Sequence, residues 1–387
     1  MQPKQHRWLV VLALVAASAI TGLTALNCGS SSGSSGGSET SGSSASGNNG
    51  DDQGDDGAAG SGSTGSGSTG SGVSSGSSGS GSAASGSGGT NPGDGGTSST
   101  GDSSTPPTPH GSSTCLKMGS GDYSKAGPYA VATKAGIDLA SSGELPTGDA
   151  GPSTFTAFYP SDMSDGCPHP IVSWANGTGV TGSQVYGFFN NNAASWGIVV
   201  MAADNPNSAG GSFVGANGGP YNRAGIDYLL KENNDASSVF YHHLSTRAGV
   251  SGHSQGAFAA TQATQHPNVE AEVQVEGGGT PKGGIAFLAL TGSADNVVGT
   301  TSPMMSYTSA TGPAMFAEYT GADHVTTPTL GGYSQMNPGT LQFMRFYTAW
   351  WRCFLGDDQV ACTMFKGGSS CGVCKDPNWT SLETKNM

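Results

Sequence analysis

A serine in the pattern G-x-S-x-G, formed by Gly252, Ser254 and Gly256, is the residue of this chain best placed to do chemistry. The segment 247–250, which is predicted to form a short buried strand, precedes the motif, and an alanine-rich segment over 257–263 follows it. These flanks predict a strand that turns sharply into a helix and exposes the serine hydroxyl above a sheet. The glycines suit such an elbow because side chains there would collide where strand and helix cross. The pattern therefore predicts that Ser254 is a nucleophile.

A serine hydroxyl is a weak nucleophile at neutral pH, so it needs a base that an acid orients and stabilises. Among the eight histidines of the chain, His324 lies in a loop that leaves a late strand. The base of such an enzyme belongs in that loop, and His324 is therefore the predicted base. His253 lies inside the elbow itself, where we expect a histidine packed in the core.

The acid should lie in a loop after a strand between the serine and the histidine. Asp295 follows the apolar segment 285–290 and gives the order Ser, Asp, His along the chain. Two rivals fit less well. Asp323 adjoins His324 and is expected to point elsewhere, and Asp204 precedes the serine in the sequence. Asp295 is therefore the predicted acid.

The oxyanion of a tetrahedral intermediate needs two preorganised N–H donors. The residue after the nucleophile, Gln255, is the first predicted donor. The second should come from the glycine-containing loop 176–179, which follows an early strand. Thr178 is the predicted second donor, and Gly177 is the nearest alternative. The aromatic residues around 186–189 fit either a packed core or an acyl pocket.

Between residues 155 and 354, apolar segments alternate with segments that have a helical pattern. Such alternation predicts an α/β fold with a mostly parallel central sheet and helices on both faces. Ligands then bind beyond the carboxyl ends of the strands, where the candidate residues lie. The predicted strands cover 155–159, 170–174, 197–203, 247–250, 269–275, 285–290 and 315–319. The predicted helices cover 184–196, 221–231, 257–263 and 341–354. The segment 302–311 is predicted to be a helix or a loop.

Four motifs together resemble the α/β-hydrolase superfamily: Trp174–Gly179, Gly252–Gly256, Thr291–Asp295 and Gly321–His324. More narrowly, they resemble its dienelactone-hydrolase and chlorophyllase-like branch, which includes bacterial cutinases and polyester hydrolases. The resemblance covers roughly 150–352. It implies an α/β-hydrolase fold and a Ser-Asp-His triad that needs no metal and no organic cofactor. Polyester hydrolases usually carry Met and paired glycines where this chain has Gln, Gly and Ala, so the resemblance does not define a substrate.

The chain has three predicted regions. Residues 1–28 carry two basic residues and then an uncharged apolar run, which predicts an export signal. Cys28 resembles the acylation site of bacterial lipoproteins. Residues 1–28 therefore have three interpretations: the signal of a lipoprotein acylated at Cys28, the signal of a secreted protein, and an uncleaved membrane anchor. Residues 29–112 are rich in Gly and Ser and are expected to form a disordered tether. Residues 113–387 are expected to form the α/β-hydrolase domain with a cysteine-rich tail.

Charge and cysteine content narrow the function classes. The net charge of −13 argues against nucleic acid as a partner and against charge-driven binding to anionic lipid. We therefore expect the protein to associate with a membrane only through a lipid anchor at Cys28. Six of the seven cysteines lie in the domain, an even number that predicts three disulfides in an exported protein. We expect Cys115 to pair with Cys167 and the other four to pair within the tail. Zinc at the C-x-x-C of 371–374 is the alternative.

These features predict an exported serine esterase, lipidated at the cell surface or secreted, that acts on a small-molecule or polymeric ester. A peptidase or an acyltransferase would use the same triad, because acyl transfer to water, amine or sugar shares its first step. A surface binding module that has lost catalysis is a third interpretation.

Overall fold

The computed structural model describes residues 114–143, 145, 152–206, 208, 219–326, 337–367 and 371–387. The export signal predicted for 1–28, the anchor at Cys28 and the tether predicted for 29–112 lie outside the described residues. No helix within the described ranges is long and apolar enough to cross a membrane.

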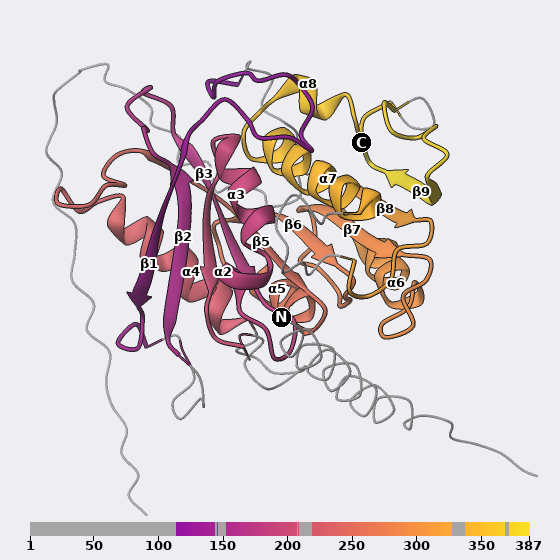
Figure 1. Ribbon diagram of the computed structural model, residues 1–387, viewed down its shortest axis with the longest axis horizontal. Helices are drawn as coiled ribbons and strands as arrows, with labels where there is room; N and C mark the ends of the chain where they lie inside the picture. Colours follow the sequence, from indigo (N-terminus) through magenta and orange to yellow (C-terminus); the bar gives the residue numbers. More distant parts are fainter. Residues whose placement is uncertain are drawn as a thin grey trace, which may run out of the picture. The chain divides into compact units, whose positions relative to one another are not determined.

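A central sheet of nine strands organises the described residues (Figure 1). The strands are β1 (Val131–Asp138), β2 (Thr154–Pro160), β3 (His169–Ala175), β4 (Val199–Ala203), β5 (Leu244–His253), β6 (Val269–Val275), β7 (Ala286–Gly292), β8 (Ala314–Tyr319) and β9 (Trp379–Lys385). Their order across the sheet is β1-β2-β4-β3-β5-β6-β7-β8-β9. Strands β3 to β8 are parallel to one another, whereas β1, β2 and β9 pair antiparallel with their neighbours. The predicted α/β class and the mostly parallel sheet are confirmed.

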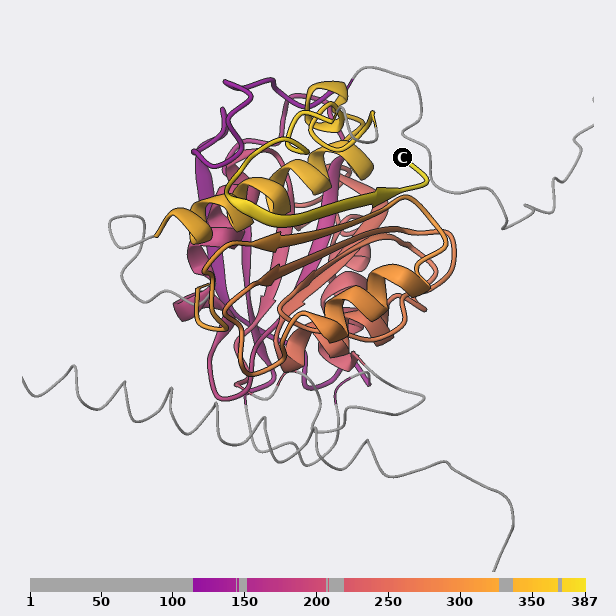
Figure 2. The same cartoon turned by 90° about the vertical axis from the view of Figure 1, so that its right-hand side faces the viewer.

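Helices cover both faces of this sheet, as expected for parallel strands that are apolar on both sides. The helices are α2 (Gly182–Val185), α3 (Gly187–Ser195), α4 (Pro220–Glu232), α5 (Gln255–Ala263), α6 (Thr301–Ser309), α7 (Pro338–Phe354) and α8 (Gln359–Cys362). Consecutive residues of β3 point to opposite faces: Val172 belongs to the cluster that includes α3 and α7, and Ile171 to the cluster that includes α4 and α5. Figure 2 shows α6 and α7 on opposite sides of β7, β8 and β9.

All six cysteines of the described part of the chain form disulfides, and these pairs are Cys115–Cys167, Cys353–Cys362 and Cys371–Cys374. The predicted disulfides are therefore confirmed. The zinc alternative at 371–374 is wrong, because both of its thiols are bonded to each other. Disulfides are consistent with an extracellular protein.

Two features differ from the sequence-based expectation, and one open alternative is resolved. The edge strands β1 and β9 were not predicted, because edge strands are partly exposed and mix polar with apolar residues. The single helix expected over 184–196 is divided into α2 and α3, since Tyr186 adopts a non-helical conformation between them. The segment 302–311, for which the sequence left a helix or a loop open, is mostly helical, because α6 covers Thr301–Ser309.

Candidate active site

Ser254 lies on a sharp turn between β5 and α5, as the elbow motif predicts. Its φ of 55° and ψ of −122° are a strained combination for a residue with a side chain. A Cβ on Gly252 would collide with the carbonyl group of Gly256, and a Cβ on Gly256 would collide with the carbonyl group of Ala175. The two glycines therefore allow the close crossing that presents the serine.

The side chains of Ser254, Asp295 and His324 meet in one hydrogen-bonded series. The Nε2 atom of His324 lies 2.9 Å from the Oγ of Ser254, and its Nδ1 lies 2.9 Å from the Oδ2 of Asp295. All three residues are buried to more than nine tenths. This arrangement lets His324 take the hydroxyl proton while the carboxylate stabilises the resulting imidazolium.

The environment of Asp295 favours its ionised form. Burial acts to raise the pKa of this carboxyl. The hydrogen bond and charge of His324, together with hydrogen bonds from two backbone N–H groups, act in the opposite direction and outweigh burial. The pKa of Asp295 therefore lies below its ordinary value. Those donors are the N–H groups of Val297 and Val298, at 2.8 and 3.0 Å from Oδ1. The acid of this series therefore carries its charge at neutral pH.

Backbone hydrogen bonds fix the loops that carry Asp295 and His324 relative to each other. The N–H of Ser293 donates to the carbonyl of Tyr319 at 3.0 Å, and the N–H of Ala294 donates to the carbonyl of Ala322 at 2.9 Å. Because β7 and β8 are neighbouring parallel strands, both loops leave the same edge of the sheet. The separation of the acid from the base is thus set by the sheet itself.

The two rival carboxylates have other partners. Asp323 accepts hydrogen bonds from the Thr326 hydroxyl at 3.0 Å and the Val325 N–H at 3.2 Å, both in its own loop. Asp204 accepts from the hydroxyl groups of Thr156 and Ser183. Neither rival is hydrogen-bonded to the candidate base, in keeping with the assignment of Asp295.

The predicted oxyanion donors Thr178 and Gln255 are neighbours, since the Thr178 hydroxyl donates to the side-chain oxygen of Gln255. Gln255 begins α5, where backbone N–H groups point toward an incoming anion. Gly177, the alternative donor, already donates its N–H to the Tyr186 hydroxyl at 3.2 Å. The geometry therefore favours Thr178 over Gly177 as the second donor.

Two residues near the triad were not assigned a role from the sequence. Glu276 directly follows β6 and is fully buried, with its carboxylate 2.9 Å from the Nε2 of His253. Tyr186 is fully buried in the core, and its hydroxyl lies 2.8 Å from the Nδ1 of the same histidine. A signal existed for Glu276, because an acidic residue just beyond the carboxyl end of a predicted strand lies at the same end of the sheet as Asp295. His253 is buried as expected, yet it is bonded to polar partners.

The ligand atoms of His253, Glu276 and His324 lie within 4.8 Å of one another, close enough to suggest a metal site. Both ring nitrogens of His324 are already bonded to Asp295 and Ser254. The Nε2 of His253 is bonded to Glu276 and to the carbonyl of His324. A cation would have to break the series described above, so this donor set fits hydrogen bonding better than metal binding.

A further buried acid, Glu272, lies on β6 beneath α5. It accepts a hydrogen bond from the Thr261 hydroxyl at 2.5 Å, and that hydroxyl also lies 2.5 Å from the side-chain nitrogen of Gln274. Burial raises the pKa of Glu272 to about 8, and the hydrogen bonds of Thr261 and Gln274 offset only part of this effect. The carboxyl is therefore mostly protonated at neutral pH.

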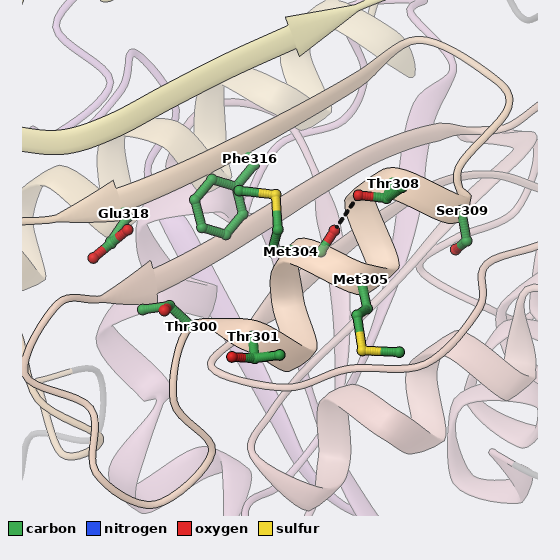
Figure 3. Close-up of a pocket in the computed structure, with 8 residues that line it drawn as sticks. All are labelled: Thr300, Thr301, Met304, Met305, Thr308, Ser309, Phe316 and Glu318. Atoms are coloured by element: carbon green, nitrogen blue, oxygen red, sulfur yellow. Dashed lines mark hydrogen bonds between the residues drawn. The ribbon is translucent and has the colours of Figure 1, made fainter.

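A cavity of about 470 Å³ lies between α6 and β8 (Figure 3). In Figure 3, the Met304 side chain points toward Phe316 and the Met305 side chain points away from it. No triad residue lines this cavity in the described part of the chain. The lining residues are Thr300, Thr301, Met304, Met305, Thr308, Ser309, Phe316 and Glu318.

A search of protein-family models finds no match to this chain, and no curated protein shows significant sequence similarity to it. The interpretation of the site therefore rests on the geometry of its own residues.

Proposed function

We propose that the domain over 113–387 is an α/β-hydrolase that cleaves carboxylic esters through an acyl-enzyme. The observation that carries this proposal is the series of 2.9 Å contacts from Ser254 through His324 to Asp295. The position of the serine on a strained turn between a parallel strand and a helix supports the same conclusion.

The proposed reaction has two halves. In the first, Ser254 Oγ attacks the ester carbonyl carbon while its proton passes to Nε2 of His324, and the tetrahedral oxyanion receives hydrogen bonds from the N–H groups of Thr178 and Gln255. The intermediate collapses, the C–O bond to the alcohol breaks, and the alcohol leaves with the proton from His324. In the second half, water attacks the acyl group and gives a proton to His324, the acid leaves, and the serine regains its proton.

The direct test replaces the nucleophile. Ser254→Ala should lower turnover of a short p-nitrophenyl ester by more than about 1,000-fold, with the thermal unfolding transition retained. Ser237→Ala, at an exposed serine that bonds only within its own turn, is the matched control and should keep full activity. A fluorophosphonate probe should label the wild type and the control, but not the Ser254 variant. Ester turnover that survives in Ser254→Ala would refute the assignment.

The substrate class is tested on the same protein. An ester and the matching amide share their acyl group and differ in their leaving group, so their ratio of kcat/KM reports the chemistry directly. We expect ester turnover to exceed amide turnover. Comparable amide turnover would favour the peptidase alternative, and product formation that requires an added amine or sugar acceptor would favour the acyltransferase. An unlabelled wild type would favour the binding module.

We also propose that the enzyme is exported and held at the cell surface through Cys28. The disulfides are consistent with an extracellular protein, and the residues before the domain have the composition of a signal and a tether. Metabolic labelling with a fatty-acid analogue should mark the full chain in a bacterial host, and Cys28→Ser should abolish the label. A labelled Cys28→Ser variant, or an unlabelled wild type, would show that this cysteine is not the anchor.

A further inference from the structure

Behind the candidate triad lies a second pair of a histidine and a carboxylate, which the proposed reaction does not use. The Nε2 of His253 is 2.9 Å from the Oε2 of Glu276 and 3.0 Å from the backbone carbonyl oxygen of His324. His253 is 3% exposed and Glu276 is fully buried. The residue before the nucleophile thus holds the peptide group of the base.

The partners of His253 define its tautomer. Both partners of Nε2 are acceptors, so Nε2 carries the proton and donates it. Burial and the charge of the neighbouring His324 hold the pKa of His253 well below its usual range, so the ring is neutral and Nδ1 is an acceptor. Burial also raises the pKa of Tyr186, so its hydroxyl stays protonated and donates to Nδ1 at 2.8 Å.

The Tyr186 hydroxyl connects this pair to the oxyanion loop. It accepts the N–H of Gly177 at 3.2 Å while it donates to His253. A Cβ on Gly177 would lie 2.8 Å from both the Tyr186 hydroxyl oxygen and the Nδ1 of His253, so only glycine fits there. One continuous series of hydrogen bonds therefore runs from the oxyanion loop, through Tyr186 and His253, to the backbone of His324.

Local irregularities in the fold bring these groups together. Glu276 has a φ of 51°, an unfavourable region for a residue other than glycine, and its N–H donates to the carbonyl of Leu290 at 2.8 Å. Tyr186 interrupts what would otherwise be one helix. Strained backbone persists where the surrounding contacts favour it and is concentrated at functional sites.

We propose that His253, held between Tyr186 and Glu276, is a positioning residue that fixes the oxyanion loop relative to the backbone of His324. This inference rests on the proposed hydrolase function. Donors and base must be aligned at the same moment in the transition state, and a displacement of about 1 Å can cost about 100-fold in rate. Loss of this series should therefore lower kcat and leave KM unchanged, because Tyr186, His253 and Glu276 are almost completely buried and do not reach the substrate.

The test is a double-mutant cycle on residues that bond to His253 from opposite sides. Tyr186→Phe removes only a hydroxyl, and Glu276→Leu removes the carboxylate. Each should lower kcat for a p-nitrophenyl ester by about tenfold, and the double variant should lose no more than the worse single variant, because either change already releases the ring. Glu276→Gln, which keeps an acceptor oxygen, is the matched control and should stay within about threefold of wild type.

Thermal unfolding is measured on each variant in parallel, because a merely structural role would couple the two sites in stability and leave kcat unaffected. Losses in kcat that multiply to about 100-fold in the double variant would overturn the proposal. A rise in KM at constant kcat, or coupling in stability alone, would overturn it too. If Glu276→Leu does not fold, His253→Gln replaces it in the cycle. The glutamine amide can donate toward the carbonyl of His324, but it offers no acceptor where Nδ1 receives the Tyr186 hydroxyl. Tyr186→Phe should therefore cause no further loss of kcat in that background.

Failure of this inference is distinct from failure of the proposed function. If the enzyme is a serine hydrolase and the inference is wrong, wild type turns over the ester, the fluorophosphonate probe labels Ser254, and the cycle is additive. If the proposed function is wrong, wild type neither turns over the ester nor reacts with the probe, and the positioning role is overturned with it.

Discussion

Asp295 and His324 lie on adjacent loops, with the Oδ2 of the carboxylate 2.9 Å from the Nδ1 of the imidazole. Asp295→Asn keeps the size of the side chain but removes the charge that stabilises the imidazolium, so kcat should fall by about 1,000-fold or more at neutral pH. Asp323→Asn is the control, because it makes the same change next to His324 in a residue bonded only to its own loop. Equal losses in the two variants would contradict the assignment of Asp295.

The hydroxyl of Thr178 bonds to the Gln255 side chain and thereby holds the oxyanion loop against the start of α5. Thr178→Val keeps the shape and the backbone N–H but removes this bond. Loss of an oxyanion donor costs about 100-fold or more, so loss of its support alone should lower kcat by about tenfold. Thr178→Ser keeps the hydroxyl and should retain wild-type turnover. Steady-state kinetics on both variants measure the effect, and equal activity of the valine and serine variants would remove any role for the hydroxyl.

Glu272 should make the free energy of unfolding depend on pH. Its folded pKa of about 8 lies above the ordinary value of 4.5, so the folded state holds this proton more tightly than the unfolded state. The resulting stability is fully present below about pH 4.5 and is lost as pH rises through about 8. Glu272→Gln imitates the protonated carboxyl, so its stability should decline less than that of wild type over this window. Denaturant unfolding at several pH values measures the difference.

The matched control for that experiment is Glu383→Gln, at an exposed glutamate on β9. It should reproduce the wild-type dependence of stability on pH. A Glu272→Gln variant whose pH dependence equals that of wild type would show that this carboxyl ionises normally in the folded protein.

The three disulfides should contribute unequally. In the loop-entropy account, a disulfide stabilises by restricting the unfolded chain, and the effect grows with the length of chain that it closes. Cys115–Cys167 spans a separation of 52 residues, whereas Cys371–Cys374 spans 3. Replacing both cysteines of the longer pair by serine should cost about 2–5 kcal/mol, and the same change in the shorter pair should cost less. Denaturant unfolding of the two double variants tests this ranking, and a larger loss for the shorter pair would contradict it.

The residues of the candidate triad could be located from the sequence because each follows a strand of a parallel sheet. The glycines around Ser254 define the elbow locally, and the carboxyl ends of β7 and β8 must lie at one edge of the sheet. Chain order and strand polarity are therefore enough to bring Asp295 and His324 toward the serine.

The rest of the site depends on contacts between segments that are distant in the sequence. The bond from Glu276 to His253 joins the ends of two neighbouring strands, and no periodicity of residue types reports it. Tyr186 fits a helical pattern in the sequence, yet in the structure it has a non-helical conformation between α2 and α3, and its hydroxyl lies 2.8 Å from the Nδ1 of His253. Burial of these polar groups is a property of the assembled core, so local sequence patterns could not predict them.

The outermost strand β9 pairs with β8, and the loop that follows β8 carries His324. Because a chain emerges from the ribosome with its amino end first, β9 can pair with β8 only after the residues up to 385 have emerged. Until then β8 exposes unpaired backbone groups, which are prone to pair with other chains. The loop of His324 thus leaves a strand that stays unpaired on its outer side until β9 has been synthesised, and a polypeptide shortened before β9 should be prone to aggregate.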